Sequence, residues 1–375
     1  MRGGLPSARM RDGVTIIDAD RHVLEPFEMW DRYLPATYRG QLELRHDPRT
    51  GFPTPCLDGE SIWRPIPPSA EAALASGARS RRAELDAAHT ADGQFAAMDA
   101  VGIDAAVLFP TFASYLVGID GLEADRALAF ARAYNLWLKD LRNHDRKRLL
   151  GAWLVAPHDP AALPGEVEAA LAHGCVAIAM RPNPIGGRTL GDPAYEPFYS
   201  ACAEYGLPII LHEGTHARAP TAGADRFHSR FALHACSHPM EQMMAFLALV
   251  EGGVFVRHPE LKVGFWEAGC GWVPYWLGRL DHIAHPHHGE EVAARALPSH
   301  LFAQNAWVGF EPDEPDLPVV ATRVGRRKLC FGTDFPHLDH ESDLVGSALA
   351  LRSELGDDLD AMLSGNAREL FGLQI

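Results

Sequence analysis

From about residue 92 onward, short apolar runs alternate with longer segments whose apolar positions recur every three or four residues. The short runs are typical of buried strands and the longer segments of amphipathic helices. Such strict alternation predicts a parallel sheet that is covered by helices on its outside. We expect eight strands, the first within Val14–Pro26 and the others at Ala105–Phe109, Leu149–Ala156, Val176–Arg181, Pro208–His212, Leu261–Glu267, Ala306–Phe310 and Leu329–Asp334.

Nearly every expected strand is followed by an expected helix. Eight such units favour a closed (β/α)8 TIM-type barrel, with residues 1–375 as one domain, over an open doubly wound sheet. No GxGxxG follows the first strand, as a dinucleotide site in an open sheet would need. The expected helices are Phe27–Leu34, Gln94–Val101, about 123–143, Pro160–His173, Tyr195–Tyr205, Pro239–Val254, Trp272–His282, Glu341–Leu355 and Leu359–Phe371.

Two segments fall outside this alternation. Residues 1–13 are expected to be a disordered lead-in. Residues from about 35 to 90 carry many prolines and then an Ala- and Arg-rich piece, so we expect an irregular insertion after the first strand. Long insertions of this kind are usually a lid, a cap or an oligomer contact. Trp63 within it could line a pocket or only anchor the loop.

Ionisable residues interrupt the apolar first strand. Asp18, Asp20 and His22 alternate along it, so a side-chain period of two places them on one face. Burying three ionisable groups is costly unless something compensates them, and carboxylate and imidazole are both ligands of divalent metals. We therefore expect a metal site here; a hydrogen-bonded pair at the barrel rim is the alternative.

Ionisable residues also stand at the ends of other strands, where a barrel carries its chemistry. Arg181 ends the fourth strand, His212 the fifth, Glu267 the sixth and Asp334 the eighth. Together with the end of the first strand, these positions would converge at one mouth of the barrel.

The chain resembles the amidohydrolase superfamily, in particular the branch that includes aminocarboxymuconate-semialdehyde, γ-resorcylate and carboxyvanillate decarboxylases. The resemblance covers nearly the whole chain and rests on five stretches: IIDADRHVLEP, LHEGTH, GGVFVRHPELKVGFWEAGCGWVPYWLGRLD, FGTDFPHLD and GNARELFGL. It implies that Asp20, His22, His212 and Asp334 hold one divalent metal ion, either Zn or Mn, and that Asp334 also takes part in catalysis.

The resemblance also exposes a departure. Decarboxylases of the family carry a histidine after the sixth strand, where this chain has Glu267. Glu267 is a catalytic candidate or the partner of a buried arginine such as Arg181. His234 and His238 are further catalytic candidates and His216 is a substrate-binding candidate, since any of the three could replace the missing histidine.

The remaining substrate-binding candidates are Arg181, Trp63 and His337. The planar guanidinium of Arg181 could bind a substrate carboxylate or close an internal ion pair. His337 follows Asp334 by three residues and could orient it. The histidine-rich run from His282 to His288 lies beyond an amphipathic helix and is expected to be a solvated loop.

On resemblance, we expect a metal-dependent lyase that performs non-oxidative decarboxylation, or a related carbon–carbon cleavage, on a small carboxylated aromatic or unsaturated acid. The alternative is a hydrolase that attacks an amide, ester, lactone or carbon–carbon bond with a metal-activated water. A barrel that binds metal without catalysis is a third, weaker reading. The resemblance also suggests a homodimer.

Composition narrows the expected partners and the expected cellular compartment. The net charge of -15 argues against a nucleic-acid partner. No apolar run is long enough to span a bilayer, and the first residues do not form a secretory signal. Six cysteines without CxxC spacing are typical of reduced thiols, so we expect a cytoplasmic protein with a small-molecule substrate.

Overall fold

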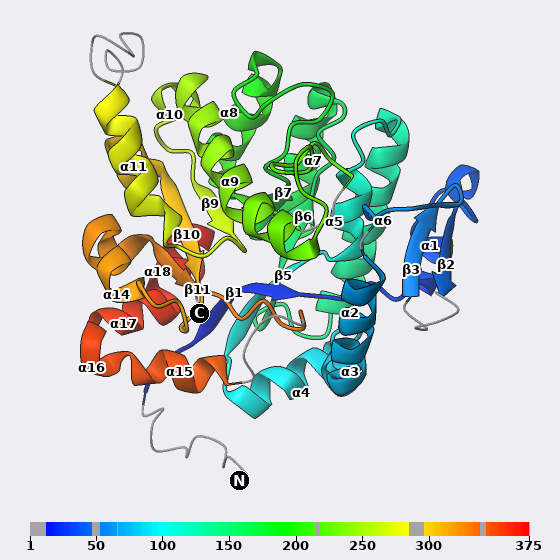
Figure 1. Ribbon diagram of the computed structural model, residues 1–375, viewed down its shortest axis with the longest axis horizontal. Coiled ribbons are helices and arrows are strands. Elements are labelled where there is room, and N and C mark those ends of the chain that lie inside the picture. The colour runs from blue at the N-terminus through cyan, green and yellow to red at the C-terminus, as the bar shows by residue number, and fades with distance from the viewer. Residues whose placement is uncertain are drawn as a thin grey trace.

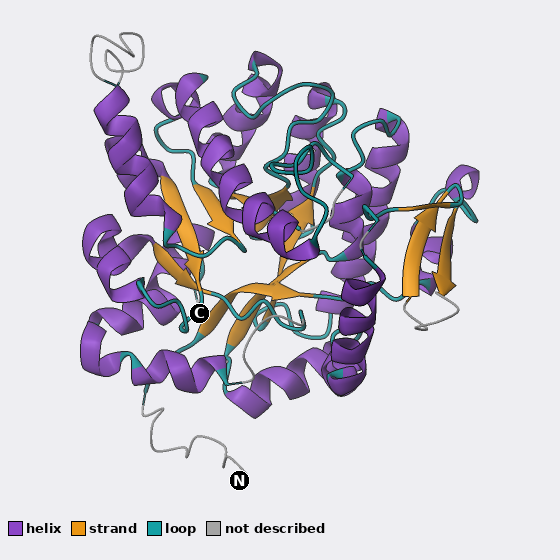
Figure 2. Ribbon diagram, viewed as in Figure 1, coloured by secondary structure: helices purple, strands orange, loops and turns teal. Residues whose placement is uncertain are grey.

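Eight strands form a single parallel sheet that curves into a nearly closed barrel with helices around it (Figure 2). The computed structural model describes residues 13–46, 53–65, 67–214, 218–284, 296–337 and 343–374. The expected (β/α)8 architecture is confirmed. In sheet order the strands are β1 (Ile17–His22), β5 (Ala105–Phe109), β6 (Leu149–Leu154), β7 (Ala177–Met180), β8 (Ile209–His212), β9 (Val263–Trp266), β10 (Ala306–Phe310) and β11 (Leu329–Phe331).

The barrel closes where the last strand returns to the first. A parallel bridge joins Arg21 to Phe335, and the His22 amide donates to the Phe335 carbonyl at 2.7 Å. The Asp334 amide donates to the Asp20 carbonyl at 2.8 Å. Gly332 permits this approach, because a Cβ there would lie 2.6 Å from the Cβ of Asp20. The closure therefore brings the first and last barrel strands together at one edge of the barrel.

Helices connect and cover the strands (Figure 1). The expected helices are present, with two differences in bounds. Helix α9 begins at Arg230 rather than at Pro239, and the expected helices Glu341–Leu355 and Leu359–Phe371 are each divided into shorter pieces. Residues 341 and 342 lie outside the described residues. The Ser229 hydroxyl caps α9 by accepting from the Ala232 amide at 3.2 Å, and Pro239 lies inside the helix. Proline is most frequent in the first turn of a helix, so its place inside α9 departs from the usual pattern. The helices after β5 are α5 (Phe112–Val117), α6 (Ala124–Arg142), α7 (Leu163–Ala172), α8 (Glu196–Tyr205), α9 (Arg230–Glu251), α10 (Val254–Arg257), α11 (Trp272–Ile283), α13 (Pro298–Asn305), α14 (Leu317–Val320), α15 (Leu344–Ala350), α16 (Arg352–Leu355), α17 (Asp358–Asp360) and α18 (Asn366–Phe371).

Short 3-10 and π segments complete the connections. The 3-10 turns are η2 (Ala36–Tyr38), η3 (Pro160–Ala162), η4 (Pro193–Tyr195) and η6 (Arg326–Lys328), and the π segments are η5 (Ala321–Gly325) and η7 (Ala361–Gly365).

The segment between the first and second barrel strands is more regular than we expected. After α1 (Glu28–Tyr33), an antiparallel sheet forms from β2 (Leu42–His46), β3 (Pro53–Leu57) and β4 (Glu60–Ser61), and it stands to one side of the barrel (Figure 1). Proline argues against a strand because it cannot donate to the ladder. Pro55 is tolerated because its carbonyl is what the sheet uses, accepting from the Ile62 amide at 3.0 Å. Helices α2 (Pro68–Ser80), α3 (Arg82–Ala87) and α4 (Ala91–Val101) follow.

The core lies inside the barrel and between the barrel and its helices. Each of the eight barrel strands is buried almost throughout, as their near-continuous apolar sequences require. Trp266 fills the barrel interior, and its indole donates to the Ala19 carbonyl at 2.6 Å across the barrel. Within the described ranges, no helix combines the length and the apolar character that crossing a membrane requires.

Candidate metal centre and active site

The end of β1 places two of its ionisable side chains at the barrel mouth. Asp20 and His22 belong to a group of residues close enough to share a metal ion, together with His212 from the end of β8. Asp18 does not join them. The pairing of β1 with β5 shifts register between Asp18 and Arg21, which breaks the strict alternation that we assumed. Asp18 instead accepts from the amide and hydroxyl of Thr333, at 3.0 and 2.5 Å.

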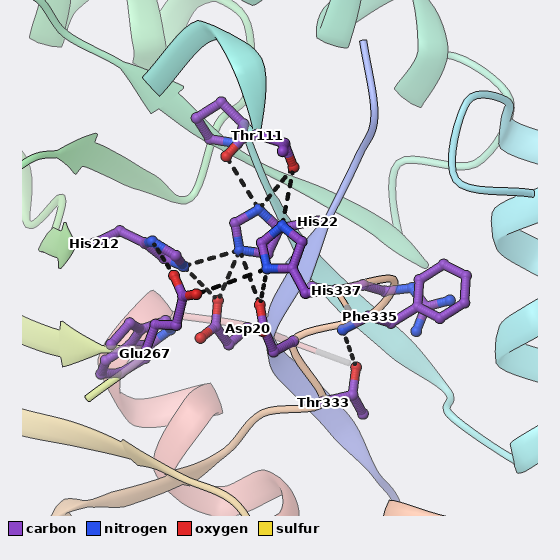
Figure 3. Close-up of polar contacts among 12 residues, drawn as sticks. Asp20, His22, Thr111, His212, Glu267, Thr333, Phe335 and His337 are labelled. Atoms are coloured by element: carbon purple, nitrogen blue, oxygen red, sulfur yellow. Dashed lines mark hydrogen bonds and ion pairs between the residues drawn. The ribbon is translucent and has the colours of Figure 1, made fainter. Parts of the chain in front are cut away.

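The side chains of Asp20, His22 and His212 point toward one another at the barrel mouth, with Glu267 and His337 beside them (Figure 3). The Nε2 atoms of His22 and His212 lie 2.9 Å apart. Asp20 Oδ1 lies 3.1 Å from Nε2 of His212 and 3.8 Å from Nε2 of His22. Asp334 Oδ1 lies 3.4 Å from Nε2 of His22. Asp20, His22 and His212 thus form one group that could hold an ion, and Asp334 belongs with His22, Glu267 and His337 to a second group that shares His22.

Backbone carbonyls fix how the two imidazoles face this point. His22 Nδ1 lies 3.0 Å from the Pro110 carbonyl, and His212 Nδ1 lies 2.9 Å from the Glu213 carbonyl. A carbonyl oxygen only accepts, so each Nδ1 carries the proton and donates it. Each Nε2 then turns its lone pair toward the cluster, which is the arrangement of metal-binding histidines.

Local backbone strain aims two of the carboxylates. Asp334 has φ 49° and Glu267 has φ 52°, both in the left-handed region that residues other than glycine seldom adopt. Such strain persists where the surrounding structure enforces it, often at functional sites. Glu267 directly follows β9, and Asp334 lies three residues after the end of β11, so the left-handed backbone turns both side chains at the barrel mouth.

Glu267 lies beside the ligand cluster and links it to two further histidines. Its Oε2 is 3.2 Å from His212 Nδ1, and its Oε1 is 3.4 Å from His238 Nε2 and 3.7 Å from His337 Nδ1. His337 also lies 2.7 Å from Asp334 Oδ1. Glu267 therefore pairs with histidines, and our suggestion that it pairs with Arg181 is wrong.

A cavity of about 290 Å³ opens beside this network. His234 and His238 of α9 line it, with ring centroids 4.4 Å apart, and Glu267 and Asp334 form its inner wall. The Ser237 hydroxyl lies 2.9 Å from His238 Nδ1, which leaves Nε2 of His238 directed at Glu267. A small molecule in this cavity would touch both the cluster and the candidate catalytic residues.

Burial and mutual repulsion shift the ionisation of the cluster. Burial raises the pKa of Asp334 to about 8; His337 opposes the rise and Glu267 adds to it. Burial also lowers the pKa of His22 well below its usual value, helped by the neighbouring His337 and His212. For His212 burial acts downward, yet the carboxylates of Asp20 and Glu267 outweigh it and raise its pKa to about 9.

The donor set fits a divalent cation. Two atoms bound at ~2.1 Å to one ion lie about 3.0 to 3.4 Å apart for bond angles between about 90° and 109°. The separations within the cluster fall close to this range, apart from the 3.8 Å between His22 and Asp20. The two Nε2 atoms lie 2.9 Å apart and can share a proton, which the raised pKa of His212 favours, and a divalent cation could take the place of that proton.

Sequence reasoning missed Glu311. It directly follows β10 and lines a narrow recess with Asp20, Glu267 and Asp334. Burial raises its pKa to about 9, and the nearby carboxylates, Asp334 first, add to the rise. The signal was available, because Glu311 stands at the end of the seventh barrel strand, as the other site residues stand at the ends of theirs.

Arg181 forms an internal ion pair, one of the two alternatives that we weighed. Its Nη2 lies 2.6 Å from Glu213 Oε2 and donates to the Gly214 carbonyl at 3.2 Å, and both side chains are fully buried. Arg181 therefore holds the short segment that directly follows His212. The carbonyl of Glu213 in that segment is the acceptor for His212 Nδ1.

The remaining candidates are Trp63, His216 and the histidine-rich run. Trp63 packs on α5, with ring centroids 6.2 Å from Phe112 and 6.0 Å from Tyr115. His216 and the run from residue 285 to 288 lie outside the described residues, while His282 lies in the last turn of α11 and is exposed.

Comparison with known proteins agrees with this architecture. A family model described as Amidohydrolase matches residues 17–373. A 2-amino-3-carboxymuconate-6-semialdehyde decarboxylase of Dictyostelium discoideum is 27% identical over 191 residues, which is 50% of this chain and 51% of that protein. The match thus spans about half the length of that relative.

Two solved structures share the fold. An amidohydrolase from Mycobacterium avium subsp. paratuberculosis has a TM-score of 0.77 and 24% identity, covering 96% of this chain and 100% of its own. A manganese-bound 5-carboxyvanillate decarboxylase from Novosphingobium aromaticivorans has a TM-score of 0.70 and 21% identity, covering 99% and 100%. Because the family model extends over nearly the whole barrel and all its strand ends, the chain belongs to the amidohydrolase family.

Proposed function

We propose that the protein is a metal-dependent carboxy-lyase that removes carbon dioxide from a small carboxylated aromatic or unsaturated acid. The observation that supports this proposal is the pair of ligand groups that share His22, one with Asp20 and His212 and the other with Glu267, Asp334 and His337, beside a cavity of about 290 Å³ that Glu267 and Asp334 line. The decarboxylase activity named for the Dictyostelium relative supports the reaction type.

Asp20, His22, His212 and Asp334 would hold one ion. Two carboxylates and two imidazoles form a mixed oxygen and nitrogen set, which suits Mn or Zn, and the oxygen ligands favour the harder Mn. The manganese in the Novosphingobium structure supports the same choice. When bound, the ion would supply a Lewis acid that orients and polarises the oxygens of a substrate carboxylate.

The residues around the cavity would manage the proton. Decarboxylation requires an acid that protonates the carbon bearing the carboxylate; the bond to the carboxyl carbon then breaks, its electron pair returns to the substrate framework, and carbon dioxide leaves. Glu267 and His238 share a contact of 3.4 Å at the cavity wall. We infer that this pair delivers the proton, with the imidazole of His238 in place of the histidine that Glu267 replaces.

Hydrolysis is the second candidate, and Glu267 is the observation that favours it. A carboxylate beside the cluster could serve as a general base for water. Its contacts with His212, His238 and His337 would keep it in place.

The proposal is tested with the purified protein loaded with Mn or Zn. We expect carbon dioxide to be released from at least one member of a panel of hydroxybenzoates and carboxymuconate-like acids. His238→Gln should slow the release, whereas His258→Gln, which changes a histidine paired with Glu196 at 2.7 Å, should not. If only esters, lactones or amides are turned over, the lyase proposal is wrong and the protein is a hydrolase.

The insertion would border the active site. Arg64 Nη2 donates to the Ala219 carbonyl at 2.7 Å, and Arg218 reaches the Ser61 carbonyl at 3.4 Å. These contacts join the middle of the insertion to the segment after β8. We infer that the insertion caps the mouth and that Trp63 limits the size of the substrate.

Assembly and location complete the proposal. Tyr275 on α11 and Phe231 on α9 have exposed fractions of 68% and 84%, which suits a homodimer whose interface covers them. All six cysteines are free and buried, which suits the reducing cytoplasm. Sedimentation of the purified protein would measure the assembly directly.

A further inference from the structure

A buried amide joins the ends of the two strands that carry His212 and Glu267. The amide is the side chain of Gln242, which lies in α9 and is 0% exposed. Its Nε2 donates to the Leu211 carbonyl at 2.8 Å and to the Trp266 carbonyl at 2.9 Å. Leu211 directly precedes His212 in β8. Trp266 ends β9 and directly precedes Glu267.

The orientation of this amide follows from its partners. A carbonyl oxygen only accepts, so the NH2 group of Gln242 faces both carbonyls and uses both of its hydrogens. Its Oε1 then has no hydrogen-bond partner among the described residues. A buried acceptor without a donor costs free energy. The two donated bonds are therefore what the fold gains from an amide at this position.

The bond to the Trp266 carbonyl acts on the backbone of Glu267. That carbonyl belongs to the peptide unit between the two residues, and the angle φ of Glu267 describes how this unit is rotated about the N–Cα bond of Glu267. Glu267 has φ 52°, a left-handed conformation that persists only where the surrounding structure holds it. Gln242 supplies a hydrogen bond that holds the unit in this rotation.

The bond to the Leu211 carbonyl acts in the same way on His212. Strands β8 and β9 pair in parallel, with His212 opposite Trp266. Beyond this pair, His212 Nδ1 lies 3.2 Å from Glu267 Oε2. One side chain thus holds the peptide units that precede both residues, and with them the separation of a candidate metal ligand from the carboxylate beside it.

Helix α9 also contacts this carboxylate one turn earlier. His238 precedes Gln242 by four residues, so the two side chains lie on one face of the helix. His238 Nε2 lies 3.4 Å from Glu267 Oε1. Both His238 and Glu267 line the cavity of about 290 Å³, whereas Gln242 is not among the described residues that line it. Gln242 would therefore act on the reaction through its neighbours and without touching the substrate.

We propose that Gln242 is a positioning residue that holds His212 and Glu267 in the arrangement that metal binding and proton delivery require. The part that concerns proton delivery rests on the proposed carboxy-lyase function. The part that concerns metal binding does not, because His212 is held in the same way whatever the substrate is. Groups that orient metal ligands in this way affect the affinity of the site for its ion.

The test is the variant Gln242→Met, which keeps the length of the buried side chain and removes both donors. We expect Mn to bind at least about tenfold more weakly, since the loss of an orienting group has effects of that size. In protein saturated with Mn, kcat for carbon dioxide release should fall at least about tenfold and KM should change by less than about twofold, because no contact with the substrate is lost.

Asn305 in α13 provides a matched control. It is 1% exposed, its Nδ2 donates to the carbonyls of Leu261 at 2.8 Å and Pro259 at 3.0 Å, and its Oδ1 has no hydrogen-bond partner among the described residues. Both carbonyls precede β9, at the end of the strand away from Glu267. Asn305→Leu therefore removes bonds of the same kind, and it should lower the melting temperature about as much as Gln242→Met without changing Mn affinity or kcat.

A second variant keeps the test independent of the folding of Gln242→Met. Gln242→Glu keeps the shape of the side chain and offers at most one donor, so its Mn affinity should lie between those of the wild type and Gln242→Met. Wild-type Mn affinity in either variant would overturn the proposal. An equal loss of Mn affinity in Asn305→Leu would also overturn it, since the effect would then be one of general stability.

The metal titrations need no substrate. If no acid in the panel releases carbon dioxide, the carboxy-lyase proposal fails, and the titrations still decide whether Gln242 positions His212.

Discussion

At the scale of single residues, the site is held by backbone groups as much as by side chains. The Pro110 and Glu213 carbonyls select the imidazole tautomers of His22 and His212, and left-handed backbone aims Asp334. This orientation is present without any ligand, because it depends on hydrogen bonds within the barrel. A preorganised cluster binds its ion without the entropic cost of first ordering the donor side chains.

Asp334→Asn should abolish turnover and leave the fold intact. The change keeps the size of the side chain but replaces the ionisable carboxyl group that faces His22 and His337, at 3.4 and 2.7 Å, by a neutral amide. The measurement is carbon dioxide release, with circular dichroism to confirm folding. Activity near that of the wild type would remove Asp334 from the mechanism.

Arg181→Met should destabilise the protein by about 3 kcal/mol or more, because it leaves the fully buried Glu213 without its counter-ion. Urea unfolding measures this loss. The double variant Arg181→Met/Glu213→Gln should recover part of it, since no uncompensated charge remains. Equal losses in the single and double variants would show that the ion pair is not the cause.

At the scale of elements, the decisive contact is the closure of β11 against β1. The two ends of the sheet meet at Asp20 and Asp334, so an error in closure displaces ligands on both sides at once. The segment after β11 can approach Asp20 this closely because Gly332 has no side chain.

Gly332→Ala should therefore weaken metal binding at least about tenfold and destabilise the barrel by roughly 1–3 kcal/mol, as overpacking does. The new methyl group would meet the Cβ of Asp20 at 2.6 Å and push β11 away. Gly278→Ala, in an exposed turn of α11 with nothing within 4 Å, should be neutral or slightly stabilising. Metal titration and thermal unfolding of both variants measure the difference, and similar behaviour of the two would reject this role for Gly332.

At the scale of the whole molecule, the metal cluster ties the first strand of the barrel to the fifth and the eighth. Asp20, His212 and Asp334 come from positions spread over almost the entire chain. A bound ion would therefore stabilise the closed barrel against the unfolded chain, as any ligand specific for the native state does.

Removing the ion by a chelator should lower the melting temperature, and adding back Mn or Zn should restore it. At a metal concentration of about 100 times Kd the expected stabilisation is ~2.7 kcal/mol. Elemental analysis should find close to one equivalent per chain. If the chelated and reloaded proteins melt at the same temperature, with no metal bound in either, then the cluster is not a metal site.

The order of elements and most of the mouth could be predicted from the sequence. Buried strands of a parallel barrel are short and apolar, so Asp20, His22, His212 and Asp334 stood out at their ends. Glu311 also stood at a strand end and was overlooked. The small antiparallel sheet was not predicted, because proline is unfavourable in a strand. Pro55 takes part in this sheet only through its carbonyl, which accepts a hydrogen bond.

Tertiary structure decided which of those residues meet, because hydrogen bonds and ion pairs across the barrel join residues that no local pattern connects. It paired Arg181 with Glu213 and placed Glu267 among three histidines. It also turned Asp18 toward Thr333 through a shift in strand register. Periodicity follows from the local backbone, so the sequence alone determined the barrel and its strand ends; partners depend on closure in three dimensions, which only the folded chain determines.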